Sequence, residues 1–296
     1  MRVFVTGAGG QVGRALLDAC AVRGFEAVGK GRSALDVTDA NAVRSAIEQV
    51  RPDWVFHCAA ATKVDRCESE TAWARALNAD APGFVAEACA SVGAGLVHYS
   101  TDFVFDGMKG QPYVETDAVA PLSVYGQTKL EGERVVERHG LDRWFVLRTQ
   151  WVYGPQGRCF PAAILAKARA GEPLRVVDDQ TGAPTTSLDL ADASLDLVDA
   201  CARGRAVSGC YHAAATGETT WYEFAREVLD RAGFEATEIA PISSAELALP
   251  ARRPAHSTLD CGKLATVLGR SMPTWQVGLE RWFRAEEHVR DEAARS

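Results

Sequence analysis

A glycine-rich turn close to the first residue constrains the fold of this chain more than any other feature. The short apolar run Val3–Thr6 is followed by glycines at positions 7, 10 and 13, and a helical pattern begins at Arg14. Glycines at this spacing permit a sharp turn, let the backbone approach a pyrophosphate and let the helix pack on the strand. The start of the helix then offers unpaired N–H groups to phosphates. We therefore expect a dinucleotide-binding strand–turn–helix unit with Gly7, Gly10 and Gly13 at the cofactor.

Apolar strands and helical patterns alternate along the first half of the chain. The expected strands cover 25–29, 54–60, 95–100 and 144–148, and the expected helices cover 40–50, 79–92 and 130–139. Continuously apolar strands separated by helices indicate a parallel sheet that is covered on both faces. The sequence therefore predicts an α/β fold with a Rossmann-type doubly wound parallel sheet, whose ligands bind at the carboxyl ends of the strands.

The pattern becomes less regular after residue 152, where proline and glycine interrupt it. A helix over 188–203 and a strand over 209–214 are expected to return to the sheet. Further helices are expected over 221–232, capped by Thr219 or Thr220, and over 275–289. We expect a dinucleotide-binding domain from residues 1–152 together with 184–214. Residues 153–183 and 215–296 are expected to form a smaller, interleaved C-terminal lobe that binds the substrate.

The composition describes an ordinary globular protein and argues against some partners. Of 296 residues, 47% are hydrophobic and 24% are charged, and the formal net charge of -7 disfavours nucleic acid or an anionic membrane as the main partner. The eight cysteines lack the CxxC or CxxH spacing of metal sites and are expected to be reduced. Neither a signal peptide nor an apolar run of membrane length is evident, so we expect a cytoplasmic protein.

Tyr125 and Lys129 carry the strongest indication of chemistry. Residues four apart on a helix lie along one face, so the Lys129 ammonium can sit beside the Tyr125 phenol and favour its deprotonated form. On its own, a Tyr-x-x-x-Lys pair is more often packing plus a solvated charge. Here the ends of the expected strands add the glycine turn and the segments 30–33, 59–62 and 100–102. Their joint occurrence indicates one site at which Tyr125 exchanges a proton with a substrate.

Three motifs together resemble the extended short-chain dehydrogenase/reductase superfamily: TGxxGxxG at 6–13, Ser-Thr at 100–101 and YxxxK at 125–129. Further strings make the chain similar to the dTDP-4-dehydrorhamnose reductase family along nearly its whole length. They cover 100–105, 115–117, 121–130, 148–153, 179–185, 219–221, 251–254 and 275–279. The resemblance implies reduction of the C4 ketone of dTDP-4-dehydro-L-rhamnose by a nicotinamide cofactor.

The resemblance also implies a role for each matching residue. Tyr125 would donate the proton, Lys129 would hold the cofactor ribose and lower the pKa of the phenol, and Thr101 would hydrogen-bond the carbonyl oxygen. Asp102 and Trp151 fall at positions used around the sugar, with a turn cap and a core aromatic as the alternatives. The residues expected to line the cofactor are Gly10, Gln11, Val12, Ala60, Ala61, Thr62 and Tyr99, with Asp36 and Val37 flanking the adenine.

Basic residues guide the expectations for the cofactor and for the diphosphate. Lys30 and Arg32 follow the second strand, where NAD-preferring members of the superfamily carry an acid. We therefore expect NADPH over NADH, with a solvated basic loop as the alternative. Arg252 and Arg253 are expected either to clamp the nucleotide diphosphate through charge-assisted bonds or to form surface salt bridges.

Two other functions stay open, the first because of departures from the family pattern. Phe103 stands where Tyr is usual and Gln150 where Ser is common, which keeps a reductase of another dTDP-4-keto-6-deoxyhexose in view. A second alternative is a non-catalytic, NADP-binding regulatory subunit of the methionine adenosyltransferase type. Some relatives carry acidic residues for a metal-bridged dimer, and the aligned positions here are Ala15 and Leu188. We therefore expect no metal, and either a monomer or a homodimer.

Overall fold

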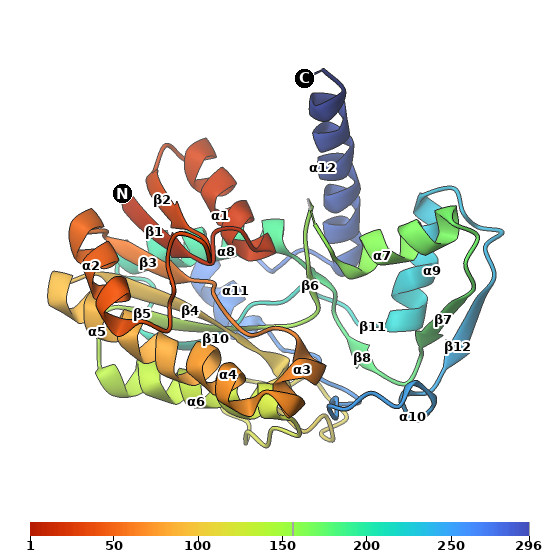
Figure 1. Ribbon diagram of the computed structural model, residues 1–296, viewed down its shortest axis with the longest axis horizontal. Coiled ribbons are helices and arrows are strands. Elements are labelled where there is room, and N and C mark those ends of the chain that lie inside the picture. The colour runs from red at the N-terminus through yellow and green to blue at the C-terminus, as the bar shows by residue number, and fades with distance from the viewer. Residues whose placement is uncertain (156, 296) are drawn as a thin grey trace.

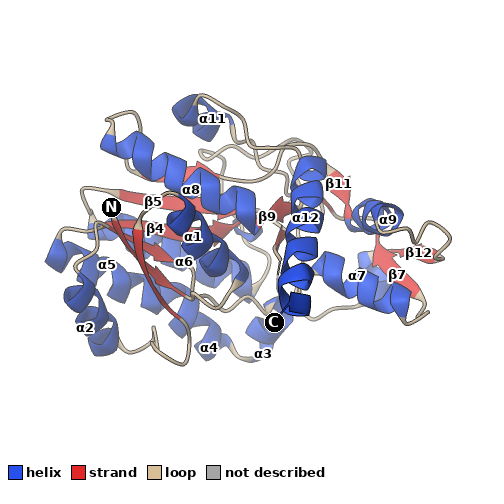
Figure 2. Ribbon diagram, turned by 90° about the horizontal axis from the view of Figure 1, so that it is seen from above, coloured by secondary structure: helices blue, strands red, loops and turns tan. Residues whose placement is uncertain are grey.

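A six-stranded parallel sheet organises the larger part of the molecule (Figures 1 and 2). The computed structural model describes residues 1–155 and 157–295, with side chains described through residue 289. In spatial order the strands are β10 (Gly209–His212), β5 (Trp144–Thr149), β4 (Gly95–Thr101), β3 (Trp54–His57), β1 (Arg2–Thr6) and β2 (Glu26–Lys30). The predicted α/β fold with a Rossmann-type doubly wound sheet is confirmed, because the order of strands reverses between β1 and β3.

Helices cover both faces of the sheet and bury one apolar cluster on each. One face packs against α1 (Gln11–Val22), α8 (Ser187–Ala202) and α11 (Gly262–Leu268), and the other against α2 (Ala40–Val50), α5 (Ala81–Val92) and α6 (Val124–His139). The central strands are buried on both sides; every residue of β4 is buried, for example. That double burial explains why these strands are mostly apolar and were predictable from the sequence.

The smaller lobe has its own apolar cluster and short two-stranded pairings. Its elements are β6 (Val152–Tyr153) with β9 (Thr185–Thr186), β7 (Leu174–Val177) with β12 (Ile239–Ile242), β8 (Thr181–Gly182) with β11 (Thr219–Thr220), and the helices α7 (Phe160–Arg169), α9 (Trp221–Arg231) and α10 (Ser244–Leu247). The last helix, α12 (Trp275–Arg295), contributes Leu279 and Trp282 to this cluster, and its far end projects from the body (Figure 1).

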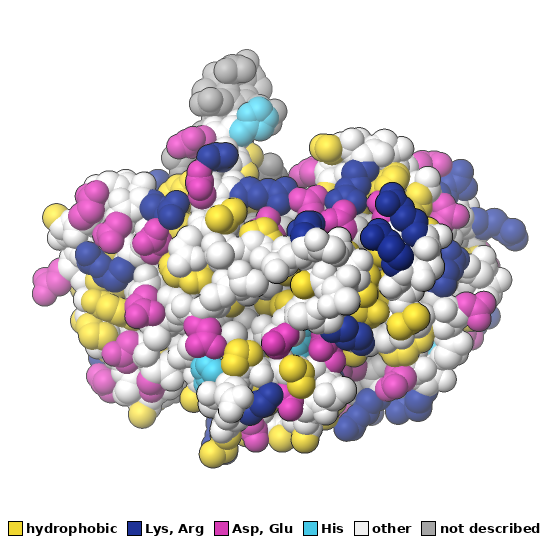
Figure 3. Space-filling model, turned by 180° about the vertical axis from the view of Figure 1, so that it is seen from behind, with side chains coloured by type: hydrophobic (Ala, Val, Ile, Leu, Met, Phe, Trp, Pro, Cys, Tyr) yellow, Lys and Arg dark blue, Asp and Glu magenta, His cyan; other side chains and the backbone are white. Residues whose placement is uncertain are grey.

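The molecular surface mixes charges of both signs. Figure 3 shows acidic and basic side chains interspersed over one face, with hydrophobic groups scattered between them. No helix in the described part of the chain is long and apolar enough to cross a bilayer.

The structure differs from the predicted elements around the helix that carries Tyr125. This helix, α6, begins at Val124 and not at residue 130, because the Ser123 hydroxyl accepts a hydrogen bond from the Gly126 N–H at 3.2 Å and caps it. The helix predicted over 79–92 is α5, which begins at Ala81, and the first two predicted positions belong to a π-helical turn, Ala76–Asp80. Two helices that the sequence analysis did not predict, α3 (Val64–Ser69) and α4 (Thr71–Arg75), lie before that turn.

Candidate active site

The glycine turn is packed so tightly that only glycine fits at two positions. A Cβ on Gly7, whose φ is +64°, would lie 2.6 Å from the Ala59 nitrogen, and a Cβ on Gly13 would lie 2.5 Å from the Gly7 carbonyl oxygen. Gly10 precedes α1 and has no side chain to cap it, so the first N–H groups of the helix are left to face a ligand. These features fit the backbone approach that a pyrophosphate requires.

Asn78 fixes the segment that forms the next rim of the site. Its amide oxygen accepts the Ala61 N–H at 2.8 Å, and its amide nitrogen donates to the Ala61 carbonyl and to the Thr128 hydroxyl, both at 3.2 Å. The segment holding Ala60 and Thr62 is thereby tied to α6. Asn78 lies in the π-helical turn and is completely buried, and sequence reasoning did not single it out. The signal available in the sequence was an amide side chain flanked by leucine and alanine, because such a side chain needs hydrogen-bond partners once it is buried.

Basic side chains lie at the end of β2, as the sequence analysis predicted. Lys30 ends the strand and is half-buried, whereas Arg32 is exposed. Nearby Asp36 is exposed and accepts hydrogen bonds from the N–H and hydroxyl of Thr38 at 2.9 and 2.7 Å. These bonds, aided by the charge of Arg32, hold the pKa of Asp36 below its usual value. The Val37 side chain turns inward and is buried in the apolar core.

Tyr125 and Thr101 meet where α6 begins and β4 ends. A Cβ on Gly126 would lie 2.2 Å from the Phe103 carbonyl oxygen, so only glycine lets the start of α6 approach the segment after β4 this closely. The Tyr125 ring packs edge-on against the Phe103 ring, with centroids 5.4 Å apart. Burial raises the pKa of the Tyr125 phenol and the adjacent Thr101 side chain opposes this rise through a hydrogen bond. The phenol therefore keeps its proton at neutral pH.

Lys129 is buried and contacts two residues of β4. Its ammonium donates to the Tyr99 carbonyl and lies 3.4 Å from His98 Nε2. Burial lowers the pKa of Lys129 to about 8, and the charge of Glu133 acts in the opposite direction. Burial is the largest influence on the pKa of the Tyr125 phenol, and the expected lowering of that pKa by Lys129 stays a prediction. The Tyr99 ring itself points into the core, where its hydroxyl donates to Ser194 at 2.8 Å.

Asp102 is a buried carboxyl group that joins the two parts of the molecule. The Thr101 hydroxyl donates to its Oδ1 at 3.0 Å, and the hydroxyl of Ser257, from the C-terminal lobe, donates to its Oδ2. Burial outweighs these bonds and raises the pKa of Asp102 to about 6. The turn that follows is capped by the Thr101 hydroxyl, which accepts the Phe103 N–H at 3.2 Å. Ser257 was not anticipated, because 155 residues separate it from Asp102.

Trp151 is held in an unusual backbone conformation by an aromatic stack. Its φ is +47°, a value that bulky residues rarely adopt. The indole stacks on that of Trp221 with centroids 3.8 Å apart and planes 12° from parallel, and its other neighbour is Gly182, where a Cβ would lie 2.6 Å from the ring. Trp151 remains partly exposed. Strain of this kind at an exposed aromatic side chain is typical of functional sites.

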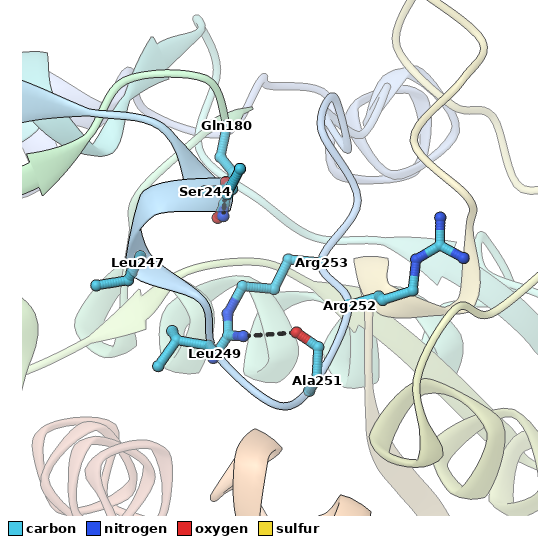
Figure 4. A pocket seen from close by; sticks show the side chains of 8 residues that line it. Gln180, Ser244, Leu247, Leu249, Ala251, Arg252 and Arg253 are labelled. Carbon is cyan, nitrogen blue, oxygen red and sulfur yellow. Dashed lines mark hydrogen bonds between the residues drawn. The ribbon is translucent and has the colours of Figure 1, made fainter.

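The two arginines expected at the diphosphate lie in different environments. Arg253 forms a two-point ion pair with Asp65 of α3, with nitrogen–oxygen distances of 2.8 and 3.2 Å, and donates to the Ala251 carbonyl at 2.8 Å. Arg252 is exposed. Figure 4 shows both beside a pocket of about 250 Å³ whose other lining residues are Gln180, Ser244, Ala245, Leu247, Leu249 and Ala251. Arg253 therefore forms a salt bridge between the two lobes, and a role of either arginine at the diphosphate stays a prediction.

Comparisons with known proteins extend over nearly the whole chain. A family model described as RmlD substrate binding domain matches residues 1–287. A dTDP-4-dehydrorhamnose reductase from Streptomyces griseus is 42% identical over 284 residues, which cover 96% of this chain and 93% of that protein. The chain belongs to the dTDP-4-dehydrorhamnose reductase family. A solved structure of such a reductase from Bacillus anthracis, in complex with NADP, superposes with a TM-score of 0.90 at 34% identity, covering 95% of this chain and 98% of that one.

One further relative of the family carries a different name. A protein from Streptomyces antibioticus named as a probable dTDP-4,6-dihydroxy-2-methyloxan-3-one 4-ketoreductase is 41% identical over 260 residues, covering 88% of this chain and 86% of that protein. Its identity to this chain is close to that of the Streptomyces griseus reductase. Family membership therefore fixes the kind of reaction more firmly than the sugar.

Four positions at which this chain departs from the family pattern can now be described. Phe103 packs against Tyr125. Gln150 is buried, and in the amide orientation that satisfies both of its polar atoms the nitrogen donates to the Ser257 carbonyl at 2.9 Å and the oxygen accepts the Ala183 N–H at 3.2 Å, so it supports the contact between the lobes. Ala15 and Leu188 pack in the apolar core beneath α1 and α8. In the described ranges, no group of three or more His, Cys, Asp or Glu side chains is arranged to hold a metal ion.

Proposed function

We propose that this protein uses NADPH to reduce the C4 ketone of dTDP-4-dehydro-L-rhamnose, giving dTDP-L-rhamnose. One observation carries the proposal: a chain that matches this reductase family over 96% of its length brings Thr101 and Tyr125 together at the carboxyl end of β4, the same edge of the sheet that carries the glycine turn. Ligands of doubly wound sheets bind at that edge. The nucleotide sugar is thus the proposed small-molecule partner.

Tyr125 is the proposed proton donor. Its phenol is protonated at neutral pH because burial raises its pKa, and a reduction requires a donor in that state. The Thr101 hydroxyl, which lies beside the phenol, would turn its single proton from Asp102 Oδ1 to the same substrate oxygen and stabilise the negative charge that develops on it. Asp102 and Trp151 would contact the sugar, since Asp102 lies next to Thr101 and Trp151 presents part of its indole at the surface.

The residues that would hold the cofactor fit a phosphorylated dinucleotide. The turn at Gly7, Gly10 and Gly13 would receive the pyrophosphate, and Lys30 and Arg32 would attract a 2'-phosphate. When bound, NADPH supplies the hydride. We therefore propose a preference for NADPH over NADH. A comparison of kcat/KM for the two cofactors tests it: a preference for NADPH that falls in an Arg32→Ala variant is expected, and equal values would overturn it.

A second candidate function differs only in the sugar. The relative from Streptomyces antibioticus, at 41% identity, supports a reductase of another dTDP-4-keto-6-deoxyhexose. Phe103 supports the same alternative, because a phenylalanine there offers no hydroxyl to the sugar. We propose either a monomer or a homodimer in the cytoplasm, which a mass measurement in solution and fractionation of cells would check.

The decisive experiment supplies the purified protein with NADPH and dTDP-4-dehydro-L-rhamnose made by the upstream dehydratase and epimerase. NADPH oxidation with formation of dTDP-L-rhamnose is expected. Faster turnover of an epimeric keto sugar would favour the second candidate. Tight binding of NADPH without turnover of any dTDP-keto sugar, together with capture of a partner enzyme, would identify a regulatory subunit of the methionine adenosyltransferase type and overturn the proposal.

A further inference from the structure

Three polar side chains form a row across the centre of the sheet, where apolar residues are expected. Thr6 of β1 is in register with His57 of β3, and His57 is in register with His98 of β4. Two residues earlier on the same strands, Phe4, Val55 and Leu96 form the apolar core beneath α2, α5 and α6. Since side chains alternate between faces, the polar row lies on that same face. Burying it costs free energy unless its polar atoms find partners.

The contacts of the row lead to Lys129. The Thr6 hydroxyl lies 2.8 Å from His57 Nδ1, and the rings of His57 and His98 stack with centroids 5.5 Å apart and planes 21° from parallel. His98 Nε2 then lies 3.4 Å from the Lys129 ammonium. All four side chains are at most 2% exposed. The row therefore joins the strand core to the one buried ammonium of the candidate active site.

Both imidazoles are neutral in this environment. Burial lowers the pKa of His57 to about 3 and that of His98 well below its usual value, and the charge of Lys129 acts in the same direction on both. A neutral imidazole has one acceptor nitrogen. Because an ammonium only donates, His98 must accept at Nε2 and carry its proton on Nδ1 if it bonds Lys129. The second partner of the ammonium, the Tyr99 carbonyl, is the next residue along β4.

We infer that His98 is a positioning residue for Lys129, whose ammonium it anchors through Nε2 so that two consecutive residues of β4 fix the ammonium at the active site. The inference rests on the proposed function through the role of Lys129. Nothing in the family comparisons assigns a role to His98 or to His57.

Other groups also face Lys129 and bear on its protonation. Glu133 lies one turn further along α6 and favours the ammonium, but its carboxylate is shared with Arg148 at 2.7 and 3.0 Å and with the Ser100 hydroxyl. Cys58 directly follows β3, and its thiol is uncharged where Lys129 titrates, because burial raises its pKa well above the usual value. His98 differs from these groups because its ring lies within reach of the ammonium itself.

A matched pair of variants tests the inference. In His98→Gln, the amide oxygen reaches about as far as Nε2, whereas the shorter side chain of His98→Asn does not. The control, His57→Asn, keeps a polar atom toward Thr6. The first readout is the pH dependence of the NADPH dissociation constant, followed by protein fluorescence, and the second is the pH profile of kcat/KM.

We expect wild type, His98→Gln and His57→Asn to lose affinity for NADPH over the same pH range, because Lys129 deprotonates at the same pH in all three proteins. In His98→Asn the loss should occur at lower pH, with NADPH bound about five- to tenfold more weakly at about pH 8, because a hydrogen bond to a charged group is lost. Identical curves for His98→Asn and wild type would overturn the inference, as would a displacement of His98→Gln as large as that of His98→Asn.

A measurement on the unmodified protein keeps the inference testable if the asparagine variant does not fold. Nitrogen NMR distinguishes the two imidazole tautomers. A proton on Nδ1 of His98, with Nε2 unprotonated, is expected, and a proton on Nε2 would overturn the inference. Neither NADPH binding nor the tautomer depends on turnover of a keto sugar, so failure of this inference would be distinguishable from failure of the proposed function.

Discussion

Replacing Asp102 by asparagine should remove a pH dependence of stability that the structure places on this carboxyl group. Burial raises the pKa of Asp102 in the folded protein from the usual 3.8 to about 6. The fold therefore favours the protonated form. The contribution of this protonated carboxyl group to the free energy of unfolding is fully present below about pH 4, and it is lost as the pH rises through about 6. The difference between the two pKa values corresponds to about 3 kcal/mol of unfolding free energy.

The assay is denaturant unfolding of wild type and Asp102→Asn between about pH 3.5 and about pH 7. Asparagine resembles the protonated carboxyl group, so the variant should gain up to about 3 kcal/mol relative to wild type across this range. Asp106→Asn is the matched control, with the opposite sign. Hydrogen bonds from the Met108 N–H and the Tyr113 hydroxyl hold the pKa of Asp106 below its usual value, so that variant should lose stability relative to wild type. A difference between Asp102→Asn and wild type that does not change with pH would refute the reasoning.

Two further predictions concern the cofactor turn and the aromatic stack. Gly13→Ala should weaken NADPH binding at least about tenfold in a fluorescence titration, because its Cβ would lie 2.5 Å from the Gly7 carbonyl oxygen. Gly9→Ala is the control: its Cβ would meet nothing within 4 Å, so NADPH should bind within about twofold of wild type. Equal losses in both would contradict this reading. Trp221→Ala should raise KM for the sugar nucleotide about three- to tenfold and abolish the circular-dichroism couplet of its stack with Trp151, while Trp221→Phe keeps most of the affinity. An unchanged KM in Trp221→Ala would contradict this prediction, because the stack with Trp221 would then not be needed to hold Trp151 in place for the sugar nucleotide.

The central sheet was predictable because its signals are local. Each strand of the first half reads as an apolar run, and the glycine turn specifies where the first strand meets its helix. The Tyr-x-x-x-Lys spacing already placed Tyr125 and Lys129 on a helix, but the regular helical pattern was expected only from residue 130, although Ser123 is a good N-cap residue. The helix starts where the N-cap residue predicts, although the apolar periodicity of its first turns is weak.

Much of the site depends on register and on contacts between distant segments. Thr6, His57 and His98 form a row only once β1, β3 and β4 are aligned. Arg253 meets Asp65 across 188 residues, which no spacing rule anticipates. The residue types at the site were predictable from motifs, whereas the position of each charge followed from packing.

The most direct test of the account is the turnover of Tyr125→Phe with NADPH and dTDP-4-dehydro-L-rhamnose. Loss of the proton donor should lower kcat by about 10²- to 10⁴-fold and leave the NADPH dissociation constant within about twofold. Tyr211→Phe is the matched control, since its hydroxyl donates to the Val207 carbonyl away from the site, and it should keep wild-type kcat. A Tyr125→Phe variant that binds NADPH normally and turns over at the wild-type rate would contradict the account.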